Sequence, residues 1–456
     1  MNRKLFKKAF LCLFFLFLPV TFASLFAQSE NTTTVTPSIN VGNTAWMLVS
    51  TALVLLMTIP GLALFYGGLV RRKNVLNILM QCFIITAVIS IEWVILGYSN
   101  TFGSSKGVLA PYIGGFKWAF LNGIGVNDPS PYVNSMPTQP IPHIVFVLYQ
   151  CMFAVITPAL IIGAFAERIK FKGFLVFSIL WAILVYNPVA HWIWSSDGWL
   201  YKKGVLDFAG GIVVHITAGI SALVMAIMIG KRKYYENMQA ITPHNIPFVV
   251  MGTGLLWVGW FGFNAGSALA ADGIAANAFL VTHIAAATAA MTWVILDWTL
   301  NKKPTSVGFC TGAIAGLAAI TPTAGFINLQ AAFVVSIMSS IVCFIMVGIV
   351  KAKLKYDDTL DVFGVHGIAG IVGSLLVGVF ATPAVQKAYS GALYGNPRQL
   401  GVQALAVGVT VIYCLLITFV IYKIVDKIFG IRANTEEETT GLDLSQHEEI
   451  AYTEAE

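Results

Sequence analysis

Long apolar segments alternate with short polar loops along most of this chain. Each apolar segment holds about 20 residues, which is enough for an α-helix to cross roughly 30 Å of hydrocarbon. Such segments begin near residues 44, 75, 143, 174, 209, 247, 276, 306, 328, 362 and 401. The pattern predicts an all-α polytopic membrane protein with eleven transmembrane helices, in a membrane domain that spans residues 44–430.

The composition agrees with this prediction. Of the 456 residues, 57% are hydrophobic and 11% are charged, whereas a soluble domain carries about 25% charged residues. Five cysteines lie inside apolar segments at scattered positions, which gives neither a disulfide framework nor the spacing of metal ligands. We interpret them as small hydrophobic side chains. They are Cys82, Cys151, Cys310, Cys343 and Cys414.

The first 28 residues have the layout of a secretory signal peptide. Four basic residues precede an apolar run that ends near Leu18, and small residues follow around Ala23 to Ala27. Such a segment is too short to count as a span and is removed during export. We predict a signal peptide at 1–28 and an extracytoplasmic segment at 29–43, with an uncleaved membrane anchor as the alternative.

The loops between the spans fall into two alternating sets that differ in positive charge. One set, together with the segment after the last span, holds 17 Lys and Arg residues, and the other set holds 6. Short loops rich in Lys and Arg stay in the cytoplasm. The chain is therefore predicted to have its N-terminus outside and its C-terminus inside, in agreement with the signal peptide.

The fifth and tenth apolar segments each place an aspartate before a histidine. Asp207 precedes His215, and Asp361 precedes His366. Eleven spans divide into two units of five plus one helix, and a repeated unit with an odd number of crossings must be inverted. Inverted repeats bring their corresponding segments together near the midplane, where transporters bind their substrates. The sequence thus predicts two inverted five-helix repeats with His215 and His366 close to each other.

These two histidines are candidates for function because an imidazole in hydrocarbon costs several kcal/mol unless it is partnered or lines a wet cavity. The alternative is that each donates one structural hydrogen bond between helices. The other histidines outside the tail lack such placement, and we interpret them as structural or exposed. They are His143, His191, His244 and His283.

The chain ends in an acidic segment. Residues 433–456 hold eight acidic residues and no Lys or Arg. We predict a cytoplasmic C-terminal tail at 431–456 that is either solvated or docked on another part of the protein.

Several long motifs lie between the first span and the tail. They run from Pro60 to Gly68, Ala164 to Arg168, Asp207 to His215, Gly259 to Ser267, Asp361 to Gly367 and Gly441 to Asp443. Together they resemble the motifs of the ammonium transporter family (Amt/MEP/Rh). The resemblance favours the bacterial ammonium branch.

The resemblance implies an outer substrate-binding site for ammonium. Its residues in this chain are Trp194 and Ser267, with Phe153 near them, and Asp207 supports the site structurally or through its charge. An aromatic face and a hydroxyl oxygen can replace part of the water around a small cation. Potassium has a similar size but donates no hydrogen bonds, so acceptors arranged for donors favour ammonium.

The resemblance also implies a phenylalanine gate and a hydrophobic pore. Phe153 and Phe263 form the gate, and His215 and His366 are the relay pair of the pore. A pair of phenylalanine rings penalises a dehydrated ion and so favours loss of a proton there. Neutral ammonia then crosses an apolar passage in which the imidazole nitrogens are polar stations.

The chain departs from the family pattern at three places. Tyr149 stands where a second phenylalanine is expected, which makes the outer site more polar. Glu92 lies deep in the second span, where an acid needs a partner or a neutral form. The tail reads Gln446 to Glu449 where a His-Gly-Glu sequence is expected.

The function predicted from these residues is uptake of ammonium and methylammonium across a bacterial inner membrane by a homotrimer. The resemblance also implies a cytoplasmic PII-type signalling protein as a partner. Two alternatives are a channel for neutral gas (ammonia or carbon dioxide) and an ammonium sensor. A third, an intramembrane metalloenzyme, lacks a carboxylate or cysteine at ligand spacing beside the histidines. We therefore expect no enzyme activity, no cofactor and no metal.

Overall fold

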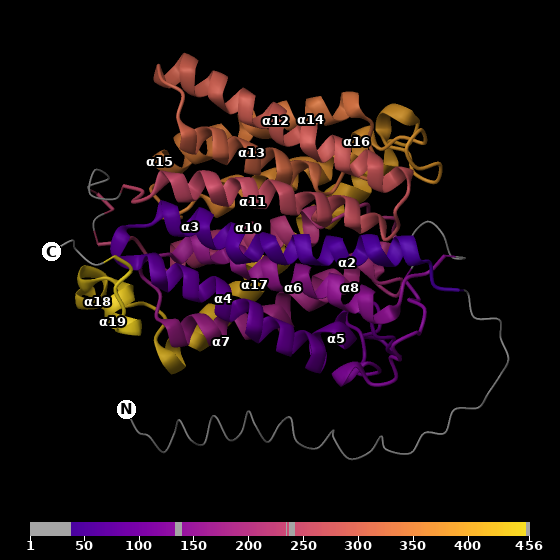
Figure 1. Cartoon of the computed structure of the whole chain (residues 1–456), viewed down its shortest axis with the longest axis horizontal. Helices are drawn as coiled ribbons and strands as arrows, with labels where there is room; N and C mark the ends of the chain where they lie inside the picture. Colours follow the sequence, from indigo (N-terminus) through magenta and orange to yellow (C-terminus); the bar gives the residue numbers. More distant parts are fainter. Residues whose placement is uncertain (1–37, 133–138, 234, 237–241, 453–456) are drawn as a thin grey trace. The chain divides into compact units, whose positions relative to one another are not determined.

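The computed structural model describes residues 38–132, 139–233, 235–236 and 242–452, and helices are its main regular elements (Figure 1). The predicted signal peptide at 1–28 lies outside the described residues, as does most of the segment at 29–43. The described chain enters its first helix, α2, at Val41, close to the predicted start of the membrane domain.

Ten helices of the described chain are long and apolar enough to cross a membrane. The eighth predicted segment forms a shorter apolar helix, α13 (Ser306–Ile320), of 15 residues. The fold is therefore an all-helical polytopic one, as predicted, while the number of eleven crossings stays a prediction. The ten long helices are Val41–Leu69, Arg72–Phe102, His143–Phe165, Phe171–Lys202, Gly211–Ile229, Ile246–Ala268, Gly273–Asn301, Leu329–Leu354, Phe363–Phe380 and Arg398–Phe429.

Several of these helices contain a π-helical turn, in which one extra residue widens the backbone. Two such turns carry the candidate histidines: Gly211–Ile216 holds His215, and Phe363–Gly367 holds His366. Two others are Trp93–Gly97 and Ala182–Tyr186. π-Helical turns frequently occur at functional sites, and these positions were not predicted from the sequence.

Corresponding spans of the two predicted repeats pack against each other. The first span, α2 (Val41–Leu56) and α3 (Ala63–Leu69), packs on the sixth, α11 (Ile246–Ala265). The fifth, α10 (Thr217–Ile229), packs on the π-helical turn that begins the tenth span. Contact of the first with the sixth span and of the fifth with the tenth is consistent with a two-fold axis that passes close to these spans, between inverted repeats.

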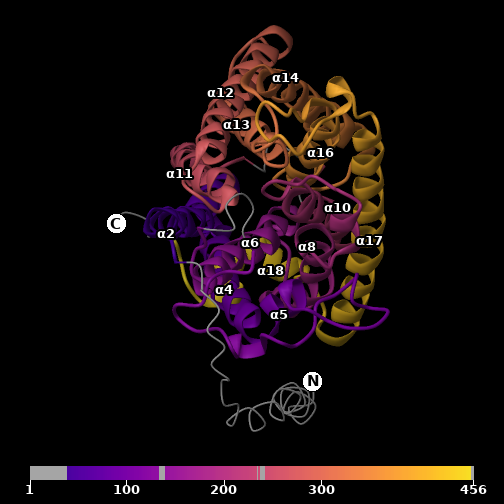
Figure 2. The same ribbon diagram turned by 90° about the vertical axis from the view of Figure 1, so that its right-hand side faces the viewer.

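The last long helix, α17 (Arg398–Phe429), joins the two halves. It packs against α7 (Phe171–Trp181) and α10 of the first half and against α16 (Ile368–Phe380) of the second. Figure 2 shows it running along one side of the bundle. This helix is the eleventh predicted span, which belongs to neither of the two five-helix repeats.

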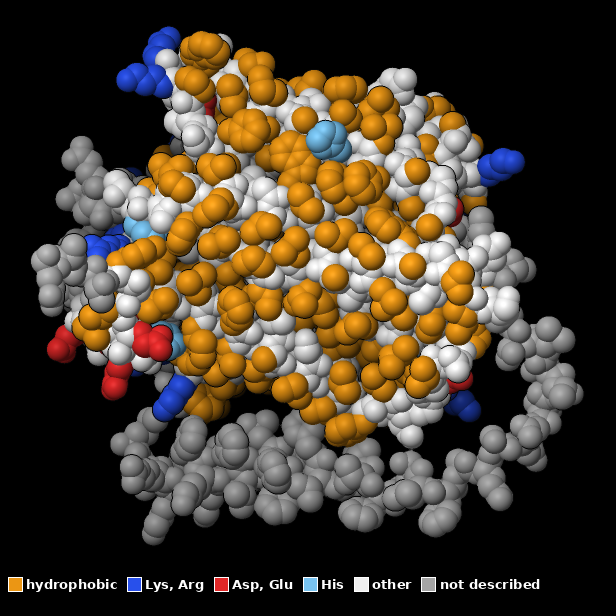
Figure 3. Space-filling model, in the orientation of Figure 1, with side chains coloured by type: hydrophobic (Ala, Val, Ile, Leu, Met, Phe, Trp, Pro, Cys, Tyr) orange, Lys and Arg blue, Asp and Glu red, His pale blue; other side chains and the backbone are white. Residues whose placement is uncertain are grey.

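One face of the described chain is covered with hydrophobic side chains across its middle, and most charged side chains there lie toward the two ends of the helices (Figure 3). Large apolar side chains on the helix surfaces are well exposed, as in Phe83 at 52% and Leu416 at 61%. In water such a surface would aggregate, whereas in a bilayer it faces hydrocarbon. The protein is thus a multi-pass membrane protein.

The acidic tail is docked as far as residue 452. Its two helices, α18 (Thr435–Thr440) and α19 (Leu442–His447), lie at one end of the bundle (Figure 1). The Asp443 carboxylate accepts hydrogen bonds from the backbone N–H groups of Leu76 and Asn77 at 3.1 and 2.7 Å. These groups belong to the first turn of α4 (Val75–Glu92), where an acidic group satisfies unpaired donors. The described part of the tail is therefore docked on the protein and is not simply solvated.

A buried ion-pair network joins the predicted cytoplasmic loops beside the tail. Glu167 lies 2.9 Å from Arg71 and 3.3 Å from Arg232, and Arg232 also pairs with Asp357 at 2.8 Å. Burial raises the pKa of the Glu167 carboxyl, but Arg232 and Arg71 offset this effect and hold the pKa below its ordinary value. The carboxylate therefore stays charged at neutral pH, and the network as a whole joins four loops.

Candidate functional site

Asp207 organises the start of the helix that carries His215. Its two carboxylate oxygens accept hydrogen bonds from four consecutive backbone N–H groups, at distances of 2.6 to 3.0 Å. These donors belong to residues 210–213, which open the fifth span and have no earlier turn of helix to bond with. Gly210 makes the entry possible because its φ of +111° is a conformation that other residues avoid. Asp207 is therefore a capping residue rather than a freely accessible anion.

Trp194 and Phe153 meet beside this cap. Trp194 ends α8 (Asn187–Trp194), and its indole N–H donates to the backbone oxygen of Asp207 at 3.0 Å. The ring of Phe153, from α6 (His143–Phe165), lies perpendicular to the indole at 5.8 Å between centroids. Asp207 thus fixes both the entry of the fifth span and the orientation of the Trp194 ring.

Ser267 and Tyr149 form a second group of polar atoms against Phe153 and Phe263. The Ser267 hydroxyl donates to the Phe263 carbonyl oxygen at 2.9 Å and lies 3.2 Å from the Tyr149 hydroxyl. The Tyr149 ring packs edge-on against Phe153 at 5.0 Å. The sequence singled out Tyr149 only as a departure from the family. The structure gives it a direct contact with Ser267.

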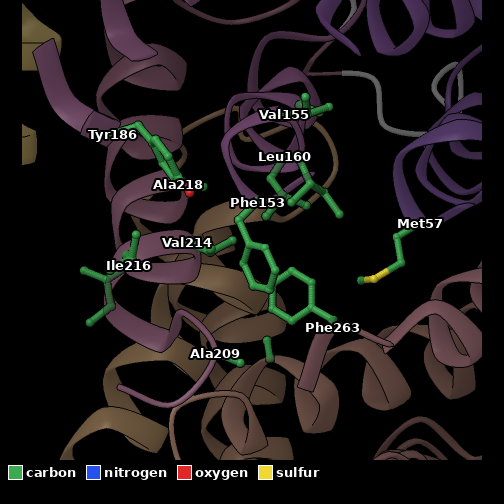
Figure 4. Close-up of a cluster of buried hydrophobic side chains, with 14 of the residues drawn as sticks. Met57, Phe153, Val155, Leu160, Tyr186, Ala209, Val214, Ile216, Ala218 and Phe263 are labelled. Carbon is green, nitrogen blue, oxygen red and sulfur yellow. The ribbon is translucent and has the colours of Figure 1, made fainter. Parts of the chain in front are cut away.

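The two candidate gate residues are in contact. The Phe153 and Phe263 rings lie 4.3 Å apart between centroids with planes tilted by 33°, and each side chain is 1% exposed. Figure 4 shows the two rings meeting, with Leu160 and Val214 also drawn in the surrounding cluster. The two rings lie between Trp194, which packs on Phe153, and His215, which lies beside Phe263.

His215 and His366 face each other behind the phenylalanine pair. Their Nδ1 atoms lie 3.3 Å apart, and their rings are nearly parallel, with 16° between the planes. His215 also stacks on Trp260 and lies 6.2 Å from the Phe263 ring. Trp260 is a contact that sequence reasoning missed, because an indole inside an apolar span carries no signal that separates it from ordinary packing.

This geometry fixes the protonation pattern of the neutral pair. A hydrogen bond between two Nδ1 atoms needs one of them protonated and the other bare. In neutral imidazole the second nitrogen takes the opposite role. The pair therefore presents one Nε2–H donor and one Nε2 acceptor. His215 Nε2 is buried and has no hydrogen-bond partner in the part of the chain that the structure describes, so a polar atom is left for a solute or water.

Both imidazoles line a narrow internal cavity. Its volume is about 10 Å³, which is close to the smallest volume that admits one water molecule. Apart from the two histidines, its wall consists of aliphatic and aromatic side chains such as Leu62, Ile156 and Trp260. Such a space has no set of oxygen atoms with which to replace the hydration shell of an ion.

Glycines bring the two imidazoles this close. A Cβ atom on Gly219 of α10 would lie 2.2 Å from the Cα of Gly367, and one on Gly370 would lie 2.9 Å from the Cβ of His215. A Cβ atom does not approach another heavy atom this closely, so only glycine permits the crossing. The close approach of the fifth and tenth spans, and with it the histidine pair, depends on these positions.

The remaining histidines do not line the cavity that holds His215 and His366. Both ring nitrogens of His191 face backbone carbonyl oxygens, those of Thr101 and Ala110, at 2.7 and 2.8 Å. His143 contacts the Tyr98 hydroxyl. Among the described residues no group of three His, Cys, Asp or Glu side chains could hold a metal ion.

The fold and these residues define a class: a polytopic helical membrane protein with a narrow, imidazole-lined internal cavity between two halves, as in channels and transporters of small solutes. Residues 45–452 match the model of the Ammonium Transporter Family. The chain belongs to that family.

Individual relatives support the same assignment. The chain is 48% identical to an ammonium transporter of Bacillus subtilis over 413 residues, which are 90% of this chain and 98% of the relative. It is 46% identical to ammonium transporter Amt1 of Archaeoglobus fulgidus, covering 90% of this chain and 99% of that protein.

Two solved structures resemble the fold. The crystal structure of Mep2 from Saccharomyces cerevisiae superposes with a TM-score of 0.80 at 34% identity, over 88% of this chain and 89% of that one. A structure titled as a sensor Amt protein also has a TM-score of 0.80, at 29% identity, over 89% of this chain and 98% of that one.

Proposed function

We propose that this protein transports ammonium across the cell inner membrane. The observation that carries the proposal is a row of side chains in which each contacts the next. Trp194 contacts Phe153, Phe153 contacts Phe263, and Phe263 lies beside His215, which faces His366 in a narrow apolar cavity. Family membership and relatives that are themselves named ammonium transporters support the choice of solute.

Recruitment of the cation takes place at Trp194, Phe153 and Ser267. The faces of the two aromatic rings attract a cation, and lone pairs on the Ser267 hydroxyl accept hydrogen bonds from ammonium. The Ser267 hydroxyl donates its hydrogen to the backbone carbonyl oxygen of Phe263. The lone pairs of the serine Oγ are therefore left to accept hydrogen bonds. A potassium ion gains the cation–π attraction but cannot donate to this oxygen.

Deprotonation takes place near the phenylalanine gate. A charged ion between Phe153 and Phe263 would lose its water without gaining polar partners, which costs several kcal/mol. Ammonia carries no charge and loses far less on leaving water, so ammonium transfers its proton to water on the outer side before it passes. The two neutral imidazoles then offer one donor and one acceptor to ammonia, and the same pair can relay the released proton.

The outer site is tested with Trp194→Leu and Ser267→Ala. Each removes about 1 kcal/mol of cation–π attraction or hydrogen bonding, so we expect roughly fivefold weaker apparent affinity in each variant. The measurement is the ammonium concentration that halves uptake of radiolabelled methylammonium. Trp298→Leu is the matched control, because Trp298 is 62% exposed on α12 (Gly273–Asn301). Unchanged competition in both site variants would place recruitment elsewhere.

A sensor is the second candidate function, favoured by the likeness to a solved sensor Amt protein. The docked tail would then report occupancy of the pore to a soluble partner. A channel for neutral gas differs from the proposed transporter in that no net charge crosses the membrane. Ammonium-evoked current in proteoliposomes separates the relayed-proton mechanism from the gas channel, and substantial flux of either kind argues against a sensor.

We also propose a homotrimer and a PII-type cytoplasmic partner, both implied by the family. The predicted cytoplasmic face offers the partner a surface on which Arg432 pairs with Glu438 of the docked tail at 2.7 Å, and Arg72 lies over the ring of Tyr452 at 5.4 Å. The partner is wrong for this chain if purified PII protein shows no nucleotide-dependent binding to the solubilised transporter.

A further inference from the structure

Glu92 is a buried acid that the transport mechanism does not use. It is the last residue of α4, is 8% exposed, and forms no ion pair with any described residue. It does not line the cavity that holds the two histidines. An unpaired carboxylate in the hydrocarbon region costs several kcal/mol, so this side chain needs either a cation or a proton.

The partner of Glu92 is an amide. Asn187, the first residue of α8, donates from Nδ2 to Glu92 Oε1 at 3.0 Å. The other oxygen of each group, Glu92 Oε2 and Asn187 Oδ1, is buried and has no hydrogen-bond partner among the described residues. A proton on Glu92 Oε2 would supply this hydrogen-bonded pair with the donor that its two unpartnered acceptors lack.

The backbone is shaped around this pair. The π-helical turn Trp93–Gly97 follows Glu92 directly, and the π-helical turn Ala182–Tyr186 precedes Asn187 directly. A Cβ on Gly97 would meet Glu92 Oε2 at 2.7 Å and Oε1 at 3.0 Å. The carboxyl group therefore lies flat against a glycine, between two widened helical turns of the kind that often mark functional sites.

We propose that Glu92 and Asn187 form a proton-binding site outside the pore, in which a protonated carboxyl and a primary amide pair face to face. One hydrogen bond runs from Asn187 Nδ2 to Glu92 Oε1. The second runs from the Glu92 O–H to Asn187 Oδ1. Binding one proton from water converts the carboxylate to the neutral acid, satisfies both orphaned oxygens and removes the buried charge.

No described Lys, Arg or His side chain forms an ion pair with Glu92. Two titratable side chains that interact electrostatically with Glu92 are Cys151 of α6 and Tyr186 of the neighbouring π-helical turn. Neither a thiol nor a phenol can carry a positive charge. Cys151 lies 3.7 Å from the Ser90 hydroxyl, and the Tyr186 ring packs edge-on against Trp93 at 6.3 Å. The ligand that this group of side chains fits is therefore a proton.

The test is infrared spectroscopy of the purified full-length protein at neutral pH. We expect the wild type to show the carbonyl stretch of a protonated, hydrogen-bonded carboxyl group that is absent from Glu92→Gln. In Asn187→Leu the band should shift toward that of a carboxyl without a partner. The proposal is overturned if wild type and Glu92→Gln have the same spectrum in this region, because Glu92 would then be ionised.

Two further readouts guard against misfolding of the variant. The Gln side chain donates from its own amide to Asn187 Oδ1 and so mimics the protonated acid, and we expect Glu92→Gln to melt at the wild-type temperature or above it. Its ammonium-evoked current should keep the wild-type size because the site lies outside the pore. A much lower melting temperature contradicts the pairing, and a lost current contradicts the location.

Discussion

Ammonium-evoked current should collapse in both His215→Leu and His366→Leu. Leucine fills a volume close to that of imidazole but offers no polar atom. Either change breaks the 3.3 Å contact between the Nδ1 atoms and leaves the cavity without a continuous polar line. The loss should be much larger than the fivefold effect expected at the outer site, because no other polar side chain that lines the cavity can replace the pair.

His215→Asp is the variant to compare with the two leucine variants, because it keeps a polar side chain at this position. A carboxylate at this position draws water into the cavity and attracts cations without distinguishing ammonium from potassium. We therefore expect retained ammonium current with new potassium current. Solid-supported membranes loaded with wild type and the three variants measure both. Wild-type ammonium current in the two leucine variants, with potassium still excluded by His215→Asp, would show that the pair serves only packing.

Gly219→Ala should disrupt the site from a distance. The added methyl group meets the Gly367 backbone at 2.2 Å, and overpacking of this kind costs about 1–3 kcal/mol. The fifth and tenth spans have to separate, and the Nδ1 atoms of the two imidazoles separate with them. We expect a lower melting temperature and a large loss of transport, although no functional group has been altered.

Gly408→Ala is the control for this variant. Gly408 lies in α17, and a Cβ there meets no atom within 4 Å. Alanine is favoured over glycine within a helix by roughly 0.5–1 kcal/mol, so this change should be neutral or stabilising. The importance of the glycine crossing is refuted if Gly219→Ala matches Gly408→Ala in both melting temperature and transport.

Sequence patterns predicted the parts of this protein that depend on local composition and on symmetry. Apolar segment length predicted the helices, and the odd number of spans in each repeat predicted that His215 and His366 would lie close together. Motif positions also selected residues that meet in space, such as Trp194 with Phe153 and Phe153 with Phe263.

Features that depend on contacts between distant segments could not be predicted. The four backbone donors of Asp207 become visible only once the chain turns at Gly210. Docking of the tail rests on Asp443 reaching the start of α4, 366 residues away in the chain from Asn77. The sequence marked Glu92 as an acid in need of a partner, and only the packing of two helices identified Asn187.

The central claim is that the protein carries ammonium, and uptake of radiolabelled methylammonium into proteoliposomes tests it most directly. The account predicts uptake well above that of empty liposomes, with inhibition by ammonium and none by an equal concentration of potassium. Uptake no faster than in empty liposomes, or inhibition by potassium as strong as that by ammonium, would contradict it.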